Sequence, residues 1–268
     1  MTSTKIVLET KSHEHGHNLI DHLYIHKHSL VHALPAHLKV LGSLALIGVF
    51  ILTPAKLVPA FAVYLFLLIG IATVSKISMI TLIRRMVVEV PFVFFALLIP
   101  FTAGGEKFPI LGVQLSVEGS WVAFGILAKS TLGVMTSILL SATTSTRELL
   151  ASFTKLRIPA TLVQIAAFML RYTAVVTDEA SRMKVARTSR AFAAKGIGDW
   201  KVLGQSLSAL FIRSYERGER VHLAMISRGF EGNSVLVDEG SSSQFQKFMA
   251  FLPSLVAALS LALIWMNK

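Results

Sequence analysis

The chain has 268 residues, of which 53% are hydrophobic and 15% charged, and its formal net charge is +11. A soluble domain carries about 25% charged residues, so this chain has too few charges to cover a water-facing surface. We therefore expect lipid to surround much of it, and we interpret the positive charge as contact with a membrane surface rather than with nucleic acid. The absence of cysteine excludes disulfides and thiolate metal sites.

Apolar stretches recur along the chain, and most approach the roughly 20 residues that a membrane-spanning helix needs. The pattern predicts an all-α membrane protein with about five transmembrane helices, in a range of about four to six, plus amphipathic helices outside the bilayer. The predicted spans are Leu38–Thr53, Leu57–Val74, Met86–Phe101, Trp121–Ala142 and Phe248–Met266.

Lysine and arginine gather on one side of these spans. Residues 143–247 hold fifteen basic and nine acidic residues, and the link between the second and third spans is also basic. Because basic links stay in the cytoplasm, we expect the N-terminus and residues 143–247 on that side. The predicted organisation is a His-rich tail over 1–37, four spans over 38–142, cytoplasmic helices over 143–247 and a last span over 248–268.

Residues 143–247 contain two longer helical patterns. Thr161–Val176 is apolar but interrupted by Gln164 and Arg171, and Trp200–Arg220 mixes apolar residues and arginines at helical spacing. An extra membrane crossing at 161–176 would place Arg171 in lipid, which is costly unless the charge is paired. Interfacial or cytoplasmic amphipathic helices are therefore the favoured interpretation.

Local signals mark the ends and the charge pairs of these helices. Ser145 or Thr146 is the predicted N-cap of a first helix, with Glu148 in its first turn and Pro159 at its end. Two intrahelical ion pairs, each joining residues four apart, are predicted as Asp178–Arg182 and Glu216–Arg220.

Two predicted helices end in an arginine beside a small residue. Arg228 precedes Gly229, a predicted helix stop, and Arg190 precedes Ala191 after a dense basic run. An arginine at a helix end presents a planar donor fork that can enter an acidic groove of another protein. Cytoplasmic arginines also bind anionic lipid headgroups, and the residues alone favour that commoner use.

Catalytic motifs are absent from the sequence. It contains no GxxxxGK[ST] phosphate loop, no HExxH and no GxSxG. We therefore expect a non-catalytic protein, to which any ATP-derived energy must come through a partner.

The order of three blocks resembles a known family. These blocks are TTSTRELLASFTKLRIP, RYTAVVTDEASRMKVARTSRAF and ERVHLAMISRGFEG. They are similar to the transmembrane coupling (T) component of energy-coupling-factor (ECF) transporters, which are ABC-type importers, and most similar to its cobalt/nickel, CbiQ-like branch. The resemblance covers about residues 30–265 and includes Pro35 and Lys39, which match the family's opening Pro-x-x-Lys-Leu segment.

The resemblance implies a role for the two arginines. In the family, paired Ala-Arg-Gly motifs dock on two cytoplasmic ATPase subunits, and here Ser227-Arg228-Gly229 and Ser189-Arg190-Ala191 stand in those places. The motif that comes first along the chain, Ser189-Arg190-Ala191, has Ala in place of Gly. Ala186-Arg187 is a rival placement for it, so the register of this motif stays open. The residues expected to support the coupling helices are Arg182, Arg187, Glu216 and Arg220.

The resemblance also implies partners. We expect two ABC ATPase subunits that use the ATP, a metal-binding membrane S component, a small accessory membrane subunit and the lipid bilayer, with no nucleic acid and no cofactor bound directly. The expected location is the inner (plasma) membrane.

Eight of the nine histidines lie between His13 and His37. Pairs four apart could share a helix face, and alternating histidines suit a flexible chelating tail, so cobalt, nickel or zinc could bind there. A polar tail without a defined site is the alternative, and it is favoured. The candidate ligands are His13, His15, His17, His22, His26, His28 and His32.

The sequence thus predicts a coupling subunit of a cobalt or nickel importer. A first alternative is a T component that serves vitamin-binding S components. A second is a stand-alone His-rich metal permease, which would need polar residues along its spans. The spans hold few, chiefly Glu89 and Lys129.

Overall fold

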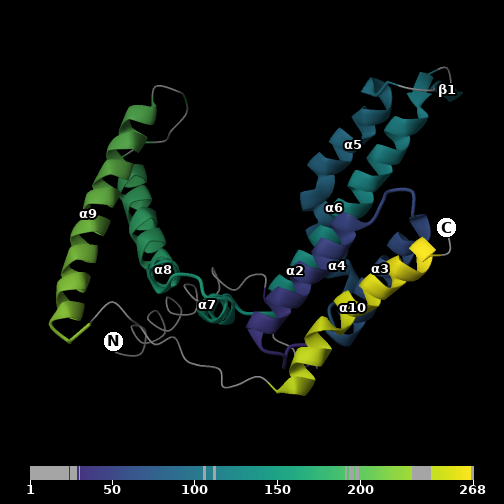
Figure 1. Ribbon diagram of the computed structural model, residues 1–268. Helices are drawn as coiled ribbons and strands as arrows, with labels where there is room; N and C mark the ends of the chain where they lie inside the picture. Colours follow the sequence, from purple (N-terminus) through teal and green to yellow (C-terminus); the bar gives the residue numbers. More distant parts are fainter. Residues whose placement is uncertain are drawn as a thin grey trace. The chain divides into compact units, whose positions relative to one another are not determined.

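The computed structural model describes residues 24, 29, 31–104, 107–110, 113–190, 192, 196, 199–230 and 243–266. Its helices, coloured along the chain in Figure 1, confirm the all-α membrane fold, and each predicted span coincides with helical residues. The helices are α2 (Ala36–Leu52), α3 (Val58–Val74), α4 (Met79–Arg85), the 3₁₀ segment η1 (Met86–Glu89), α5 (Val90–Thr102), α6 (Val117–Thr143), α7 (Thr146–Lys155), α8 (Ala160–Ser189), α9 (Trp200–Ile226) and α10 (Gln244–Met266).

A short hairpin joins α5 to α6 and was not predicted. Strand β1 (Lys107–Ile110) pairs antiparallel with β2 (Val113–Ser116). The Ser116 side chain then accepts a hydrogen bond of 3.1 Å from the Gly119 backbone N–H, so it is the N-cap of α6.

The described residues form two compact units. One comprises residues from Leu23–Ser152 together with Glu239–Lys268, and the other comprises residues from Phe153–Asp238. The first unit is a helix bundle, and the second contains α8 and α9. The predicted domain ranges themselves stay a prediction.

The bundle core lies where α2, α3, α6 and α10 pack together. Phe50, Tyr64, Leu68 and Met135 are among its largest fully buried side chains. A Cβ atom on Gly42 of α2 would lie 2.5 Å from the backbone oxygen of Ala250 in α10, so glycine is what permits this close approach. Apolar contact between helices therefore holds the bundle together, and many outward-facing apolar side chains remain for lipid.

The third predicted span, Met86–Phe101, begins with the 3₁₀ segment η1 and continues as α5. Glu89 ends that segment and is only 5% exposed. Its Oε1 accepts hydrogen bonds from the hydroxyls of Ser130, at 2.8 Å, and Thr131, both on α6. These bonds satisfy a carboxyl group that lipid would not.

Length and apolar composition would allow three of the described helices, α6, α8 and α10, to cross a membrane. The apolar helices α2 and α3 are shorter, at 17 residues each. The first half of α8 is mostly apolar, with Arg171 as its one charged residue, and most of the charged residues of the helix follow from Asp178 onward. The interfacial placement of α8 therefore stays a prediction.

The junction between α6 and α7 is fixed by a buried ammonium group. Lys39 is 7% exposed, and its Nζ donates to the backbone oxygens of Thr143, at 2.8 Å, and His32, at 3.1 Å. Thr143 is the last residue of α6, so Lys39 supplies a donor to a carbonyl that has no partner within the helix.

A capping box formed by Ser145 and Glu148 lies at the start of α7. The Ser145 hydroxyl accepts from the Glu148 backbone N–H, and the Glu148 carboxylate accepts from the Ser145 backbone N–H, both at 3.3 Å. This confirms Ser145 as the N-cap of α7. The helix ends at Lys155, before the predicted Pro159, and Arg157 then takes a left-handed backbone with φ of 61°.

Replacing Lys39 by methionine tests the α6–α7 junction. The substitution keeps the apolar stem but removes the donor to a buried and a half-buried carbonyl, so Lys39→Met should lower the free energy of unfolding by about 2 kcal/mol. Lys56→Met, at an exposed lysine, is the matched control. Thermal unfolding in detergent should separate the two variants, and equal midpoints would show that the Lys39 bonds contribute nothing.

Candidate functional site at two arginine-tipped helices

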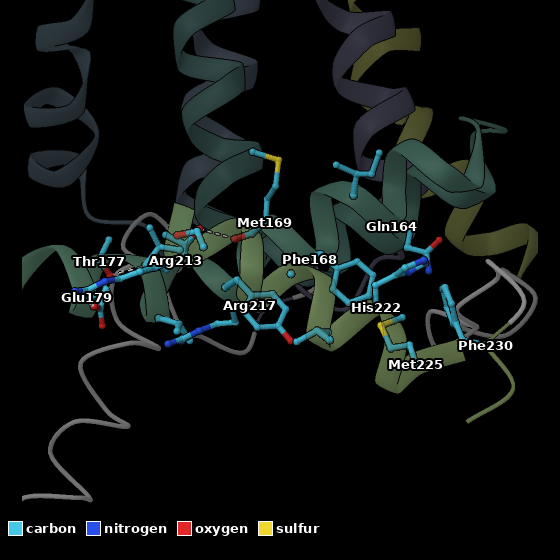
Figure 2. Close-up of a pocket in the computed structure, with 18 of the residues that line it drawn as sticks. Gln164, Phe168, Met169, Thr177, Glu179, Arg213, Arg217, His222, Met225 and Phe230 are labelled. Carbon is cyan, nitrogen blue, oxygen red and sulfur yellow. Dashed lines mark hydrogen bonds and ion pairs between the residues drawn. The ribbon is translucent and has the colours of Figure 1, made fainter. Parts of the chain in front are cut away.

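The second unit is built on α8 and α9, which run antiparallel. Residues early in α8, such as Gln164, line the same groove as Met225 and Phe230 near the end of α9. Further along α8, Glu179 meets Arg213 of α9, and their Oε1 and Nη1 atoms are 2.6 Å apart. Figure 2 shows this ion pair together with the residues of the groove.

The Glu179 carboxylate interacts with arginines of both helices. The hydrogen bond from Arg213 holds the pKa of Glu179 below its ordinary value of 4.5, against a smaller opposing effect of desolvation, and Arg182 and Arg217 lower the pKa further. The Nε atom of Arg182, three residues after Glu179 in the same helix, lies 3.9 Å from the Glu179 Oε2 atom. The predicted Asp178–Arg182 pair is therefore wrong, because Arg182 points toward the carboxylate that also binds α9.

The groove between the two helices has a volume of about 680 Å³. Its lining is largely apolar, and the stacked rings of Phe168 and Tyr172, with centroids 6.3 Å apart, form part of one wall. The Nε2 atom of Gln164 is buried there without a hydrogen-bond partner. Two loosely packed helices with an open apolar groove can change their packing more easily than helices in a filled core.

Helix α9 ends in a Schellman motif. Gly229 has φ of +79°, its N–H donates to the Ile226 oxygen at 2.9 Å, and the Phe230 N–H donates to the Met225 oxygen at 3.1 Å. Met225 and Phe230, which this motif brings together, both line the groove. The predicted helix stop at Gly229 is confirmed, and Arg228 lies exposed at the turn.

A backbone hydrogen bond of the same kind is found at the end of α8. The Phe192 N–H donates to the Arg187 oxygen at 3.1 Å, which repeats the Phe230–Met225 bond of α9. The hydroxyls of Ser189 and Ser227 each donate to the backbone oxygen four residues earlier, at 3.0 and 2.9 Å. Arg190 and Arg228 thus occupy equivalent, exposed positions, whereas Arg187 lies one turn earlier and is half-buried. Ala191 lies outside the described residues.

The remaining predicted residues are spread over the helix surfaces. Glu216 and Arg220 are both exposed on α9, and no ion pair within 4.0 Å joins them in the described part of the chain, so this predicted pair is not formed. His222 of α9 is exposed at the groove.

The histidine tail falls mostly outside the described residues. These undescribed candidates are His13, His15, His17, His22, His26 and His28. His32 is described, and its Nδ1 lies 2.7 Å from the Ser29 hydroxyl. No group of three metal-ligating side chains occurs among the residues that the structure covers. Metal binding by the tail therefore stays a prediction.

Alanine substitutions at two glycines test the turn that presents Arg228. Gly229→Ala should destabilise the end of α9 by about 1 kcal/mol, because a Cβ atom disfavours positive φ. Gly204→Ala, inside the same helix with open space around it, should stabilise α9 by a similar amount. Thermal unfolding of the full chain compares them, and equal effects of the two substitutions would contradict the Schellman geometry.

Comparison of the sequence with known proteins finds a matching family. The sequence model of the CbiQ family, described as cobalt transport protein, matches residues 27–237. An uncharacterized protein of Methanocaldococcus jannaschii is 28% identical over 87% of this chain and 89% of its own length. A protein of Methanocorpusculum labreanum, named as a fused cobalt transport protein CbiMQ, is 27% identical over 76% of this chain and 35% of its own length. The cobalt transport protein CbiQ of Rhodobacter capsulatus is 25% identical over 45% of this chain and 50% of its own length.

Proposed function

The chain belongs to the CbiQ family of cobalt transport proteins, and from this premise we propose that it is the coupling subunit of an ECF-type ABC importer for cobalt or nickel ions. It is a multi-pass membrane component of a transport system. In the proposed complex it carries no catalytic site of its own and transmits movement from two ATPase subunits to a metal-binding S component.

One observation carries the proposal, namely that α8 and α9 end in equivalent turns with exposed arginines. Because the helices are antiparallel, Arg190 and Arg228 lie at opposite ends of the pair. Two similar donor forks, separated in this way, suit two similar acidic grooves, as two copies or two relatives of one ATPase would offer. The equivalence also favours Arg190 over Arg187 as the residue of α8 that contacts an ATPase subunit.

The proposed mechanism follows from this placement. ATP binding draws the two ATPase subunits together, and the helix ends that they hold move with them. The α8–α9 pair then changes its geometry and tilts the S component, which exposes its ion to the cytoplasm. A groove that is not filled by side chains gives the pair room for such a change.

The partners and orientation belong to the same proposal. Positive charge on α8 and α9 supports a cytoplasmic position for them beside the inner membrane, with the N-terminus on that side. The relative named as fused CbiMQ supports a membrane partner for the chain, with a small accessory subunit as a further component. In that orientation the histidine tail could receive ions after release, without acting as the first capture site.

Charge reversal at Arg228 tests ATPase docking. Arg228→Glu should weaken association with the ATPase subunits by about tenfold or more, because it places a carboxylate against an acidic groove. The protein should still insert, and Lys184→Glu, at an exposed lysine of α8, should leave association unchanged. Co-purification with the ATPases measures the effect, and an intact complex with intact uptake for Arg228→Glu would reject the assignment.

A second pair of variants tests the register of the first motif. Arg190→Glu should release an ATPase subunit, whereas Arg187→Glu should retain it, because Arg187 lies one turn from the helix end. Co-purification would assign the contact to Arg187 if the two results were reversed.

The substrate separates this proposal from its main alternative, a T component that serves vitamin-binding S components. The complete complex should take up radiolabelled cobalt or nickel, and it should not take up members of a vitamin panel. Vitamin uptake without metal uptake would favour the alternative.

A stand-alone permease is disfavoured because Glu89 and Lys129 of the spans bond to hydroxyls and a backbone oxygen of neighbouring helices.

A further inference from the structure

The contact between Glu179 and Arg213 differs from every other described contact between α8 and α9. Among the described residues of these two helices, it is the only side-chain hydrogen bond or ion pair that joins one helix to the other. The groove between the helices is lined largely by apolar side chains, and apolar contact has no fixed donor and acceptor. Among the described residues of the two helices, a directional contact with a fixed donor and a fixed acceptor therefore joins α8 to α9 only between Glu179 and Arg213.

The ion pair also lies between the two exposed arginines. Arg190 lies eleven positions after Glu179, and Arg228 lies fifteen positions after Arg213 in the opposite direction. At the rise of an α-helix these segments correspond to roughly 16 Å and roughly 22 Å. The ion pair is therefore placed where a movement of one helix end can be converted into movement of the other.

We propose that Glu179 and Arg213 form the pivot of the α8–α9 pair, the point that fixes how the helices cross and through which displacement at Arg190 is transmitted to Arg228. This inference rests on the proposed function, and it assigns positioning roles to two residues that do not themselves contact the ATPases. The partial exposure of the pair, 21% for the Glu179 side chain and 60% for that of Arg213, suits a contact that must turn without being buried.

Asp178 provides a control that the chain itself supplies. It is adjacent to Glu179 and carries the same charge, but no described ion pair includes it. Removing its charge changes the net charge of α8 by the same amount as removing that of Glu179. A difference between the two variants therefore reports the contact with Arg213 and not the general electrostatics of the helix.

The first test measures the geometry directly. The chain has no cysteine, so pairs of spin labels can be attached at introduced cysteines, one pair at Val185 and Leu207 and the other at Leu162 and Leu223, all exposed. In the complete complex, Glu179→Gln and Arg213→Gln should each broaden the distance distribution of both pairs, whereas Asp178→Asn should leave both narrow. Narrow distributions in either glutamine variant would overturn the proposal.

The second test measures transmission. Glu179→Gln should lower metal uptake per ATP hydrolysed by about two- to fivefold, the modest loss expected for a partly exposed ion pair. The double variant Glu179→Arg with Arg213→Glu should restore both the uptake ratio and the narrow distances, because it rebuilds the pair with reversed charges. Unchanged uptake per ATP in Glu179→Gln, or no recovery in the double variant, would overturn the proposal.

A failure of the pivot proposal can be distinguished from a failure of the proposed function. If Arg228→Glu leaves the ATPases bound, the docking assignment is lost, but the label distances still report whether Glu179 and Arg213 hold the helices. If the ATPases are released and the distances do not respond to Glu179→Gln, docking stands and the pivot is rejected.

Discussion

The antiparallel pairing of α8 and α9 is the constraint on which the functional account depends. Each helix ends in a turn that exposes an arginine, and antiparallel packing sends these two ends in opposite directions. If the helices were parallel, both arginines would lie together and could serve only one acidic surface. The ion pair between Glu179 and Arg213 is the polar contact that fixes this arrangement along the helices.

The bundle has a different physical character. Its polar groups bond to neighbouring helices. The buried Lys39 bonds to the end of α6, the buried Glu89 bonds to hydroxyls of α6, and the half-buried Lys129 bonds to the Ile51 oxygen of α2. Such bonds fix helices against one another in a medium that offers no water. The bundle is thus suited to hold a fixed geometry, while the loosely packed α8–α9 pair is suited to change.

Much of this architecture could be predicted because its causes are local. Apolar runs predicted helices at all five expected span positions, Ser145 and Glu148 marked the start of α7, and Gly229 marked the end of α9, since each depends on residues a few positions apart. The 3₁₀ break at Glu89 and the hairpin before α6 had no comparably clear signal. Among the candidate site residues, Arg190 and Arg228 lie exposed at helix ends, but their roles stay predictions, and Ala191 and most of the histidines lie outside the described residues.

The ion pair illustrates what the sequence could not reveal. Spacing of four residues pointed to Asp178 as the partner of Arg182 and to Glu216 as that of Arg220, but Glu179 instead bonds to a residue 34 positions away. No local rule identifies such a partner, because it depends on how two helices cross. A carboxylate surrounded by arginines on both helices was the one available signal, and it could be interpreted only once the helices had been paired.

The central claim is that the chain transmits movement and neither carries ions nor hydrolyses nucleotide by itself. The most direct measurement is to reconstitute the purified chain alone in liposomes, and to follow radiolabelled cobalt uptake and ATP hydrolysis beside the complete complex. The account predicts both activities in the complex and neither in the chain alone. Uptake or hydrolysis by the isolated chain would contradict it.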